Sequence, residues 1–157
     1  MKLYLAQHGD AISKEEDPDR PLSASGRNDV QAVSRFLGRA GISVDSIVHS
    51  GKLRARQTAE LVAAQLAPGL ALQTNENINP RDPPVAVAEE IDHWLNDTIL
   101  VGHLPHMAKL ATLLLTSCEE PVIITFTPGT VVCLLRSEDK RWSLKWLLSP
   151  DLVANKE

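Results

Sequence analysis

Short apolar runs alternate with stretches of helical spacing over the first 115 residues of the chain. A short apolar run that ends at a glycine or a polar cluster is typical of a buried strand, whereas apolar residues three or four positions apart are typical of an amphipathic helix. The runs predict strands near residues 3–6, 44–48, 70–73 and 98–101. The helical spacing predicts helices near residues 24–40, 52–66, 85–95 and 105–114. Ser23 is expected to cap the first helix, and Pro105 suits the first turn of the fourth.

The last third of the chain changes to a strand pattern. Apolar runs at 122–126 and 130–135 flank a Thr-Pro-Gly turn, and apolar residues alternate with other residues from Trp142 to Leu148. Such alternation is typical of antiparallel strands. The whole pattern predicts an α/β fold in which a mostly parallel central sheet is flanked by helices and carries antiparallel C-terminal strands.

The composition fits one domain spanning residues 1–157, because hydrophobic residues make up 43% and charged residues 23% of the chain. The net charge of -4 argues against a nucleic-acid partner. Cys118 and Cys133 form no CxxC pair, which favours a reducing compartment. No apolar stretch approaches the length of about 20 residues that a membrane span needs, so we expect a cytoplasmic protein without a membrane partner.

Polar residues follow three of the predicted strands. Gln7 to Asp10 follow the first, His49 to Gly51 follow the second, and Gly102 and His103 follow the strand at 98–101. In a parallel sheet, chemistry gathers beyond the carboxyl ends of the strands. We therefore expect these three groups of residues to share one site.

The residue types in these groups suit a bound phosphoryl group. His8 precedes Gly9, which leaves room for a substrate, and a neutral imidazole is a good nucleophile because its unperturbed pKa is about 6.5. His103 opens a predicted helix, where free N–H groups favour an anion. Arg54 lies in a first helical turn, and its guanidinium can fork onto phosphate oxygens. Each histidine could instead be purely structural, and Arg54 could be an ordinary surface residue. However, the occurrence of His8, Arg54 and His103 at three strand ends favours a shared site.

Three motifs, in this order and spacing, resemble the histidine phosphatase superfamily. They are LYLAQHGDA followed by RPLSASG, then HSGKLRARQTAE, then LVGHLPHM. Within the superfamily the pattern resembles that of the small bacterial SixA-type phosphohistidine phosphatases. The resemblance runs from residue 2 to about residue 150.

This resemblance implies a phosphoglycerate-mutase-like fold and a hydrolase that needs no metal and no organic cofactor. His8 would attack phosphorus and become a phosphohistidine, which water would then hydrolyse. Arg54 and His103, with Gln7 and Gly9 beside the nucleophile, would bind the phosphoryl oxygens in an in-line transition state. The implied partner is a protein with a phosphorylated histidine, such as a phosphotransfer domain in signal transduction. The chain itself is expected to be a monomer.

Gln7 departs from the superfamily pattern, which carries arginine immediately before the nucleophile. Glutamine keeps an N–H donor but loses the positive charge and the fork. Arg20, on a loop expected to fold over the strand ends, is the preferred replacement for the phosphate-binding charge. Lys52 and Arg81 are weaker candidates, since both suit ordinary surface positions.

The general acid has no convincing motif. Glu76, Asp82 and Asp10 are the candidates, and an imidazole leaving group, which can be protonated before it departs, has less need of one. Two other functions stay open. The loss of an arginine is expected in a non-catalytic or weakly catalytic phosphohistidine-binding regulator, and the superfamily also admits a small-molecule phosphomonoesterase. Zinc ligation by His103 and His106 is disfavoured, because no carboxylate or cysteine accompanies them at ligand spacing.

Overall fold

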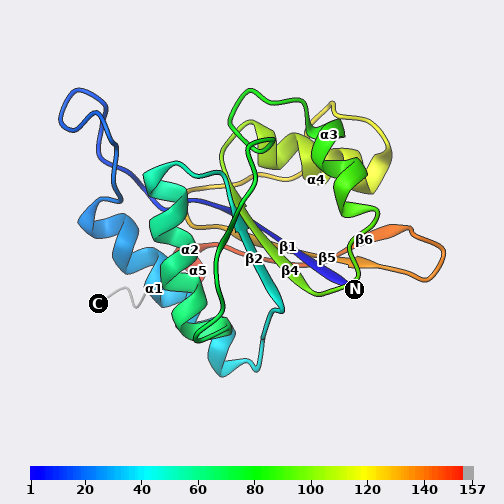
Figure 1. Ribbon diagram of the computed structural model, residues 1–157, viewed down its shortest axis with the longest axis horizontal. Coiled ribbons are helices and arrows are strands. Elements are labelled where there is room, and N and C mark those ends of the chain that lie inside the picture. The colour runs from blue at the N-terminus through cyan, green and yellow to red at the C-terminus, as the bar shows by residue number, and fades with distance from the viewer. Residues whose placement is uncertain (154–157) are drawn as a thin grey trace.

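Six strands form one sheet, in the order β3-β2-β4-β1-β5-β6, in the computed structural model, which describes residues 1–153 (Figure 1). The strands are β1 (Lys2–Gln7), β2 (Ser46–His49), β3 (Gln73–Thr74), β4 (Thr98–Gly102), β5 (Val131–Arg136) and β6 (Trp142–Leu148). β3, β2, β4 and β1 pair in parallel, whereas β5 and β6 are antiparallel. The predicted fold class is therefore confirmed. Residues 154–157, the last four of the predicted domain, lie outside the described residues.

Helices cover both faces of the sheet (Figure 1). One face carries α1 (Ala24–Arg39), α2 (Leu53–Leu66) and α5 (Pro150–Val153), and the other carries α3 (Pro84–Ile91) and α4 (His106–Thr116). Successive side chains of a strand point to opposite faces. Tyr4 of β1 accordingly packs in the first layer and Leu5 in the second, which explains why β1 is apolar throughout. Within residues 1–153, none of the helices has both the length and the apolar character that a membrane span requires.

The helix starts fall where the sequence indicates. Ser23 caps α1, because its side-chain oxygen accepts a hydrogen bond from the Gly26 N–H at 3.0 Å. Pro105 immediately precedes α4 and takes the capping position. α2 begins at Leu53, which places Arg54 in its first turn.

The run at 122–126 is not a strand, contrary to expectation. Its apolar residues divide between two environments: Ile124 and Phe126 are buried, whereas Val122 and Ile123 are 44% and 54% exposed. β5 pairs with β1 on one side and β6 on the other. Both edges of β5 are therefore occupied, and residues 122–126 cannot pair with it. They form an irregular connection on the face of the sheet that carries α3 and α4, where Ile124 and Phe126 are buried in the core.

Two other elements are shorter than predicted. The strand at 70–73 reduces to Gln73–Thr74, because Leu70 and Leu72 turn toward the core under α1 and α2 instead of extending the sheet. The third helix ends at Ile91, and Leu95 is 84% exposed. The guanidinium of Arg136 donates hydrogen bonds to the last carbonyl groups of this helix, so the helix is capped before it reaches Leu95.

Candidate active site

The carboxyl ends of β1, β4 and β2 lie side by side at one edge of the sheet. The parallel register places Gln7 opposite Gly102, so β1 and β4 end at the same level. Residues that follow such ends converge, because parallel strands point the same way. The structure thereby brings the side chains of His8, Arg54 and His103 together.

His8 is held in one orientation and one tautomer. Its Nδ1 lies 2.6 Å from the carbonyl oxygen of Gly9, which can only accept, so Nδ1 carries the proton. The unprotonated Nε2 faces Arg54, whose Nε donates to it at 3.3 Å. Burial lowers the pKa of His8 to about 4, and the charge of Arg54 adds to this, although the Gly9 carbonyl opposes it. His8 is therefore neutral at pH 7, with its nucleophilic lone pair on Nε2.

His103 lies against His8, with ring centroids 4.9 Å apart. The side chain is 1% exposed, and its Nε2 is 2.6 Å from the hydroxyl of Ser50. Nδ1 has no hydrogen-bond partner within residues 1–153. Burial, together with the positive charges nearby, lowers the pKa of His103 to about 2. The group is neutral in this state, and a bound phosphoryl anion is the charge that would favour its protonation.

Two arginines lie close to His8. Arg54 is half-buried, and burial followed by the charge of Arg20 lowers its pKa. The charge of Arg20 also contributes to the low pKa of His8, so the loop does fold toward the strand ends. Arg20 is held there by a hydrogen bond from its Nε to the carbonyl oxygen of Ile12 at 3.1 Å. Lys52 lies near enough for its charge to lower the pKa of His103.

Gln7 ends β1 with its side chain 7% exposed. Its Oε1 has no hydrogen-bond partner within the described part of the chain, which is costly for a buried amide. Because Oε1 can only accept, the side-chain N–H groups of Gln7 are the ones that could donate to a phosphoryl oxygen. Gln7 thus offers hydrogen-bonding groups without charge at the position where the superfamily pattern has arginine.

The residue after His8 must be glycine, because there is no space for a side chain at position 9. A Cβ there would lie 2.7 Å from Cγ2 of Val30 and 2.9 Å from the carbonyl oxygen of Gly26, so the loop packs directly on α1. The N–H of Gly9 donates to the hydroxyl of Thr58 at 3.0 Å. In this arrangement the donor is taken, and Gly9 positions His8 instead of offering an N–H to phosphate.

Three polar residues that hold the site together were not singled out from the sequence. Ser50 contacts His103, Gln57 accepts from the N–H of Leu22 at 2.8 Å, and Thr58 bonds to Gly9. All three belong to the motif HSGKLRARQTAE. The motif itself was the available signal, but which atoms they meet depends on loops distant in sequence.

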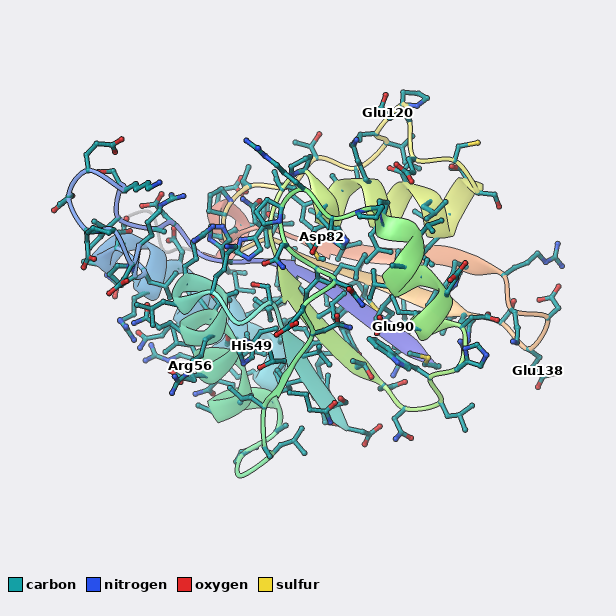
Figure 2. The ribbon with its side chains drawn as sticks, turned by 45° about the horizontal axis from the view of Figure 1, so that its top comes forward. His49, Arg56, Asp82, Glu90, Glu120 and Glu138 are labelled. Atoms are coloured by element: carbon teal, nitrogen blue, oxygen red, sulfur yellow. The ribbon has the colours of Figure 1, made fainter. Side chains whose placement is uncertain are left out.

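Of the acid candidates, Asp10 lies near enough to His8 for its charge to oppose the lowering of the His8 pKa. Asp82 is on the loop before α3, where its Oδ2 accepts from the N–H of Asn79 at 2.7 Å (Figure 2). Asp10 accepts from the hydroxyl of Ser23 at 2.6 Å, and Glu76 is exposed. None of these carboxylates forms a hydrogen bond with His8, Arg54 or His103.

His106, the other residue weighed for zinc, is completely buried. Neither of its ring nitrogens has a hydrogen-bond partner within residues 1–153, and burial lowers its pKa to about 4. Nowhere in this described part of the chain do three His, Cys, Asp or Glu side chains gather as a metal ion would require.

A neutral imidazole, a guanidinium and a second imidazole thus lie together where the parallel strands β1, β2 and β4 end. A family model described as histidine phosphatase superfamily (branch 1) matches residues 3–83. The chain belongs to this superfamily.

Individual relatives agree with this assignment. An uncharacterized protein of Picosynechococcus sp. is 35% identical over 119 residues, which cover 71% of this chain and 71% of that protein. Phosphohistidine phosphatase SixA of Escherichia coli (strain K12) is 23% identical over 155 residues, covering 96% and 94% of the two chains. A solved structure of the protein histidine phosphatase SixA complexed with tungstate superposes with a TM-score of 0.87, at 21% identity, over 98% of this chain and 100% of that chain.

These similarities confirm two predictions. The resemblance to SixA-type proteins holds over nearly the whole chain, and the fold is the phosphoglycerate-mutase-like fold that this resemblance implied. Membership of the superfamily supports phosphatase activity, which makes the chain a hydrolase.

Proposed function

We propose that the protein removes phosphoryl groups from phosphohistidine in another protein, through a covalent intermediate on His8. The observation that carries the proposal is the orientation of His8. The Gly9 carbonyl fixes the proton on Nδ1, and Nε2 keeps its lone pair beside the guanidinium of Arg54. Phosphoryl transfer needs a nucleophile and a positive charge at adjacent positions.

The reaction takes two displacements. His8 Nε2 forms a bond to phosphorus while the bond from phosphorus to the substrate imidazole breaks, and that imidazole leaves with a proton. Water then attacks phosphorus, the bond to Nε2 breaks, and inorganic phosphate is released. Arg54 exchanges its contact with Nε2 for the phosphoryl oxygens, and His103, once protonated, donates to them.

Two observations support phosphohistidine as the substrate. The first displacement replaces one N–P bond by another, so it needs little driving force, and Asp10 and Asp82 bond to Ser23 and Asn79 and not to the three central residues. The relatives named for SixA are a phosphohistidine phosphatase and a protein histidine phosphatase. The partner that we propose is a phosphotransfer domain that displays its phosphohistidine on the surface.

The test is release of phosphate from a phosphorylated histidine phosphotransfer domain. We expect rapid release by the wild type, a loss of at least about 10³-fold for His8→Ala, and an unchanged rate for His93→Ala, which changes an exposed histidine. Brief reaction with ³²P-labelled domain should leave label on wild type but not on His8→Ala.

Other results would contradict the proposal in distinct ways. Binding of the domain without label or release indicates a non-catalytic regulator. Hydrolysis of small phosphoesters at rates far above those for the domain indicates a small-molecule phosphomonoesterase.

A further inference from the structure

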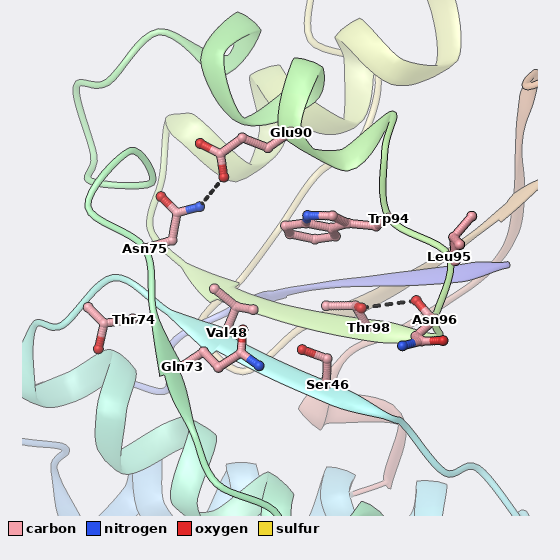
Figure 3. Close-up of a pocket in the computed structure, with 10 residues that line it drawn as sticks. All are labelled: Ser46, Val48, Gln73, Thr74, Asn75, Glu90, Trp94, Leu95, Asn96 and Thr98. Carbon is pink, nitrogen blue, oxygen red and sulfur yellow. Dashed lines mark hydrogen bonds between the residues drawn. The ribbon is translucent and has the colours of Figure 1, made fainter.

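A pocket of about 350 Å³ lies beside β2, among residues other than His8, Arg54 and His103 (Figure 3). It opens between β2 and the segment that follows α3, on the face of the sheet that carries α3 and α4. Ser46 and Val48 of β2 and Thr98 of β4 form its floor. The volume is at the lower end of the range for small-molecule sites, which suits one planar group and its substituent.

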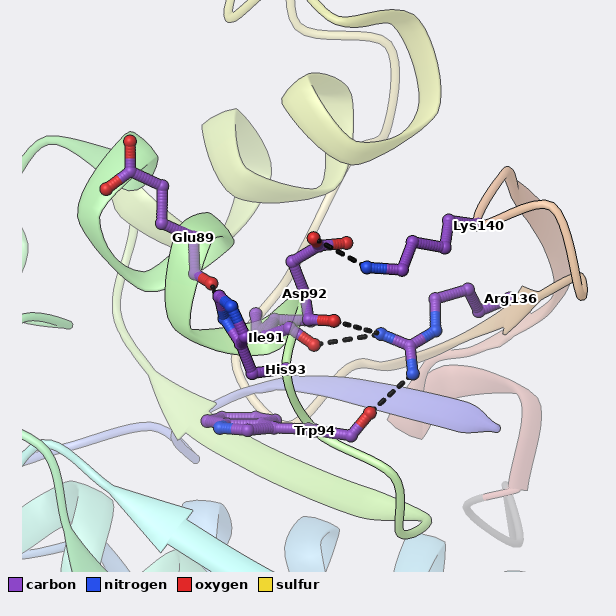
Figure 4. Close-up of polar contacts among 7 residues, drawn as sticks. All are labelled: Glu89, Ile91, Asp92, His93, Trp94, Arg136 and Lys140. Carbon is purple, nitrogen blue, oxygen red and sulfur yellow. Dashed lines mark hydrogen bonds and ion pairs between the residues drawn. The ribbon is translucent and has the colours of Figure 1, made fainter.

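An aromatic ring covers this floor. Figure 3 shows the indole of Trp94 lying along the strands, so that one ring face looks toward Val48 and Thr98. The backbone of Trp94 is held from behind, because the Arg136 guanidinium donates to its carbonyl oxygen (Figure 4). A flat ligand can therefore stack on a ring whose backbone is held in place and which packs, partly buried, against the apolar layer beneath α3 and α4.

One carboxylate supplies the only charge among the residues that line the pocket. Glu90 accepts from the side-chain amide of Asn75 at 2.6 Å through Oε2, and from that of Asn77 at 2.8 Å through Oε1. Each carboxylate oxygen has a second acceptor position, so both remain able to accept from a ligand. The two amides fix the plane of the carboxylate in advance.

The lining excludes an anionic ligand and favours a donor. It contains no lysine, arginine or histidine. The side-chain amides of Gln73 and Asn96 stand at its margin, where they can satisfy further polar groups. Trp94 offers a surface for stacking, and the carboxylate of Glu90 offers two acceptor oxygens without a cation nearby. These features together favour a planar group that presents two parallel N–H donors.

We propose that this pocket binds a planar N–C–N unit with two N–H donors, stacked on Trp94 and paired with the carboxylate of Glu90. Two sources share this chemistry: the donor edge of guanine in a free nucleoside, and the guanidinium of an arginine-like side chain. The site is independent of the phosphatase reaction, since neither Glu90 nor Trp94 belongs to the group around His8.

Calorimetric titration of the full chain with guanosine, and separately with agmatine, tests the proposal and distinguishes the sources. We expect one of them to bind with a dissociation constant below about 1 mM, corresponding to more than about 4 kcal/mol. For guanosine, inosine lacks one of the paired donors and should bind at least tenfold more weakly. Glu90→Gln should also weaken binding at least tenfold, and Trp94→Phe should weaken it less.

Glu89→Gln is the matched control, because Glu89 is the adjacent residue but does not line the pocket (Figure 4). It should bind as the wild type does. The proposal is overturned if neither guanosine nor agmatine binds when the ligand concentration is tenfold above the expected dissociation constant of about 1 mM. It is also overturned if Glu90→Gln binds as tightly as the wild type. Phosphatase activity of Glu90→Gln serves only to show that the variant is folded.

Discussion

At the scale of single residues, we expect Gln7 to limit how strongly the proposed site holds phosphate. The amide is buried, its Oε1 is unpaired, and it lies beside the nucleophile. A hydrogen bond to a charged group contributes about 1.5–3 kcal/mol, against about 0.5–1.5 kcal/mol for a neutral one. The site therefore depends on Arg54 and Arg20 for charge, and its affinity for free phosphate should be low.

Substitution at this position should act in both directions. Gln7→Arg restores the charge and should tighten inhibition by inorganic phosphate about tenfold, since 1.4 kcal/mol corresponds to a factor of ten. Gln7→Glu has nearly the same size but adds a negative charge, and it should weaken inhibition by a similar factor or more. The measurement is the inhibition constant of phosphate against a phosphorylated domain. Equal constants for all three proteins would show that Gln7 does not face the phosphoryl group.

At the scale of elements, the first turns of α2 act as a frame for the site. Thr58 accepts from the N–H of Gly9 at 3.0 Å and donates to the carbonyl oxygen of Arg54 at 2.8 Å. Gln57, one residue earlier, holds the N–H of Leu22. One helix thus fixes the nucleophile loop, its own arginine, and the loop that carries Arg20.

Thr58→Val keeps the size of the side chain but removes both hydrogen bonds. The buried Gly9 N–H then loses its partner, and the unfolding free energy should fall by about 1–3 kcal/mol. Activity should fall as well, because the Gly9 carbonyl that orients His8 belongs to the freed loop. Urea unfolding and the rate of phosphate release measure the two effects. Thr58→Ser, which keeps the hydroxyl, should recover most of both; a Val variant with full stability and full activity would contradict this role.

Elements with a strong local sequence pattern were predictable. Elements whose extent depends on contacts with distant parts of the chain were not. β1 and β4 are buried on both faces, so each appears in the sequence as a continuous apolar run. Residues 122–126 are also largely apolar, but both edges of the following strand β5 are already paired. Likewise, Arg136 ends α3 from a strand about 45 positions later, which no local pattern contains.

At the scale of the whole molecule, the order of the motifs predicted which side chains meet, because parallel strands bring their carboxyl ends together. His8, Arg54 and His103 were found in this way. The contacts that orient them were not, since Ser50 and Thr58 reach partners about 50 positions away. The pocket beside Trp94 is also a product of packing alone, assembled from three strands and the segment after α3.

At the scale of the whole molecule, four imidazoles in residues 1–153 resist protonation, because burial lowers the pKa of His8, His49, His103 and His106. Burial lowers the pKa to about 4 for His8, about 2 for His103 and about 4 for His106. The unfolded chain takes up protons near pH 6.5, but the folded chain does not until far lower pH. Between pH 6.5 and 4 the unfolded state therefore binds more protons, and stability falls as the pH is lowered. Each group contributes at most about 1.4 kcal/mol per pH unit in this window.

His106→Leu isolates one of these groups outside the candidate active site. Both of its ring nitrogens are buried without a partner, so replacing them with an apolar side chain should raise the unfolding free energy by about 1–3 kcal/mol even at pH 8. The gain should grow as the pH falls from 6.5 to 5, because the variant no longer has an imidazole that only its unfolded state protonates. Urea unfolding at pH 8, 6.5 and 5 measures both effects. A variant whose stability runs parallel to that of the wild type at all three pH values would mean that His106 is protonated as easily in the folded protein as in the unfolded chain.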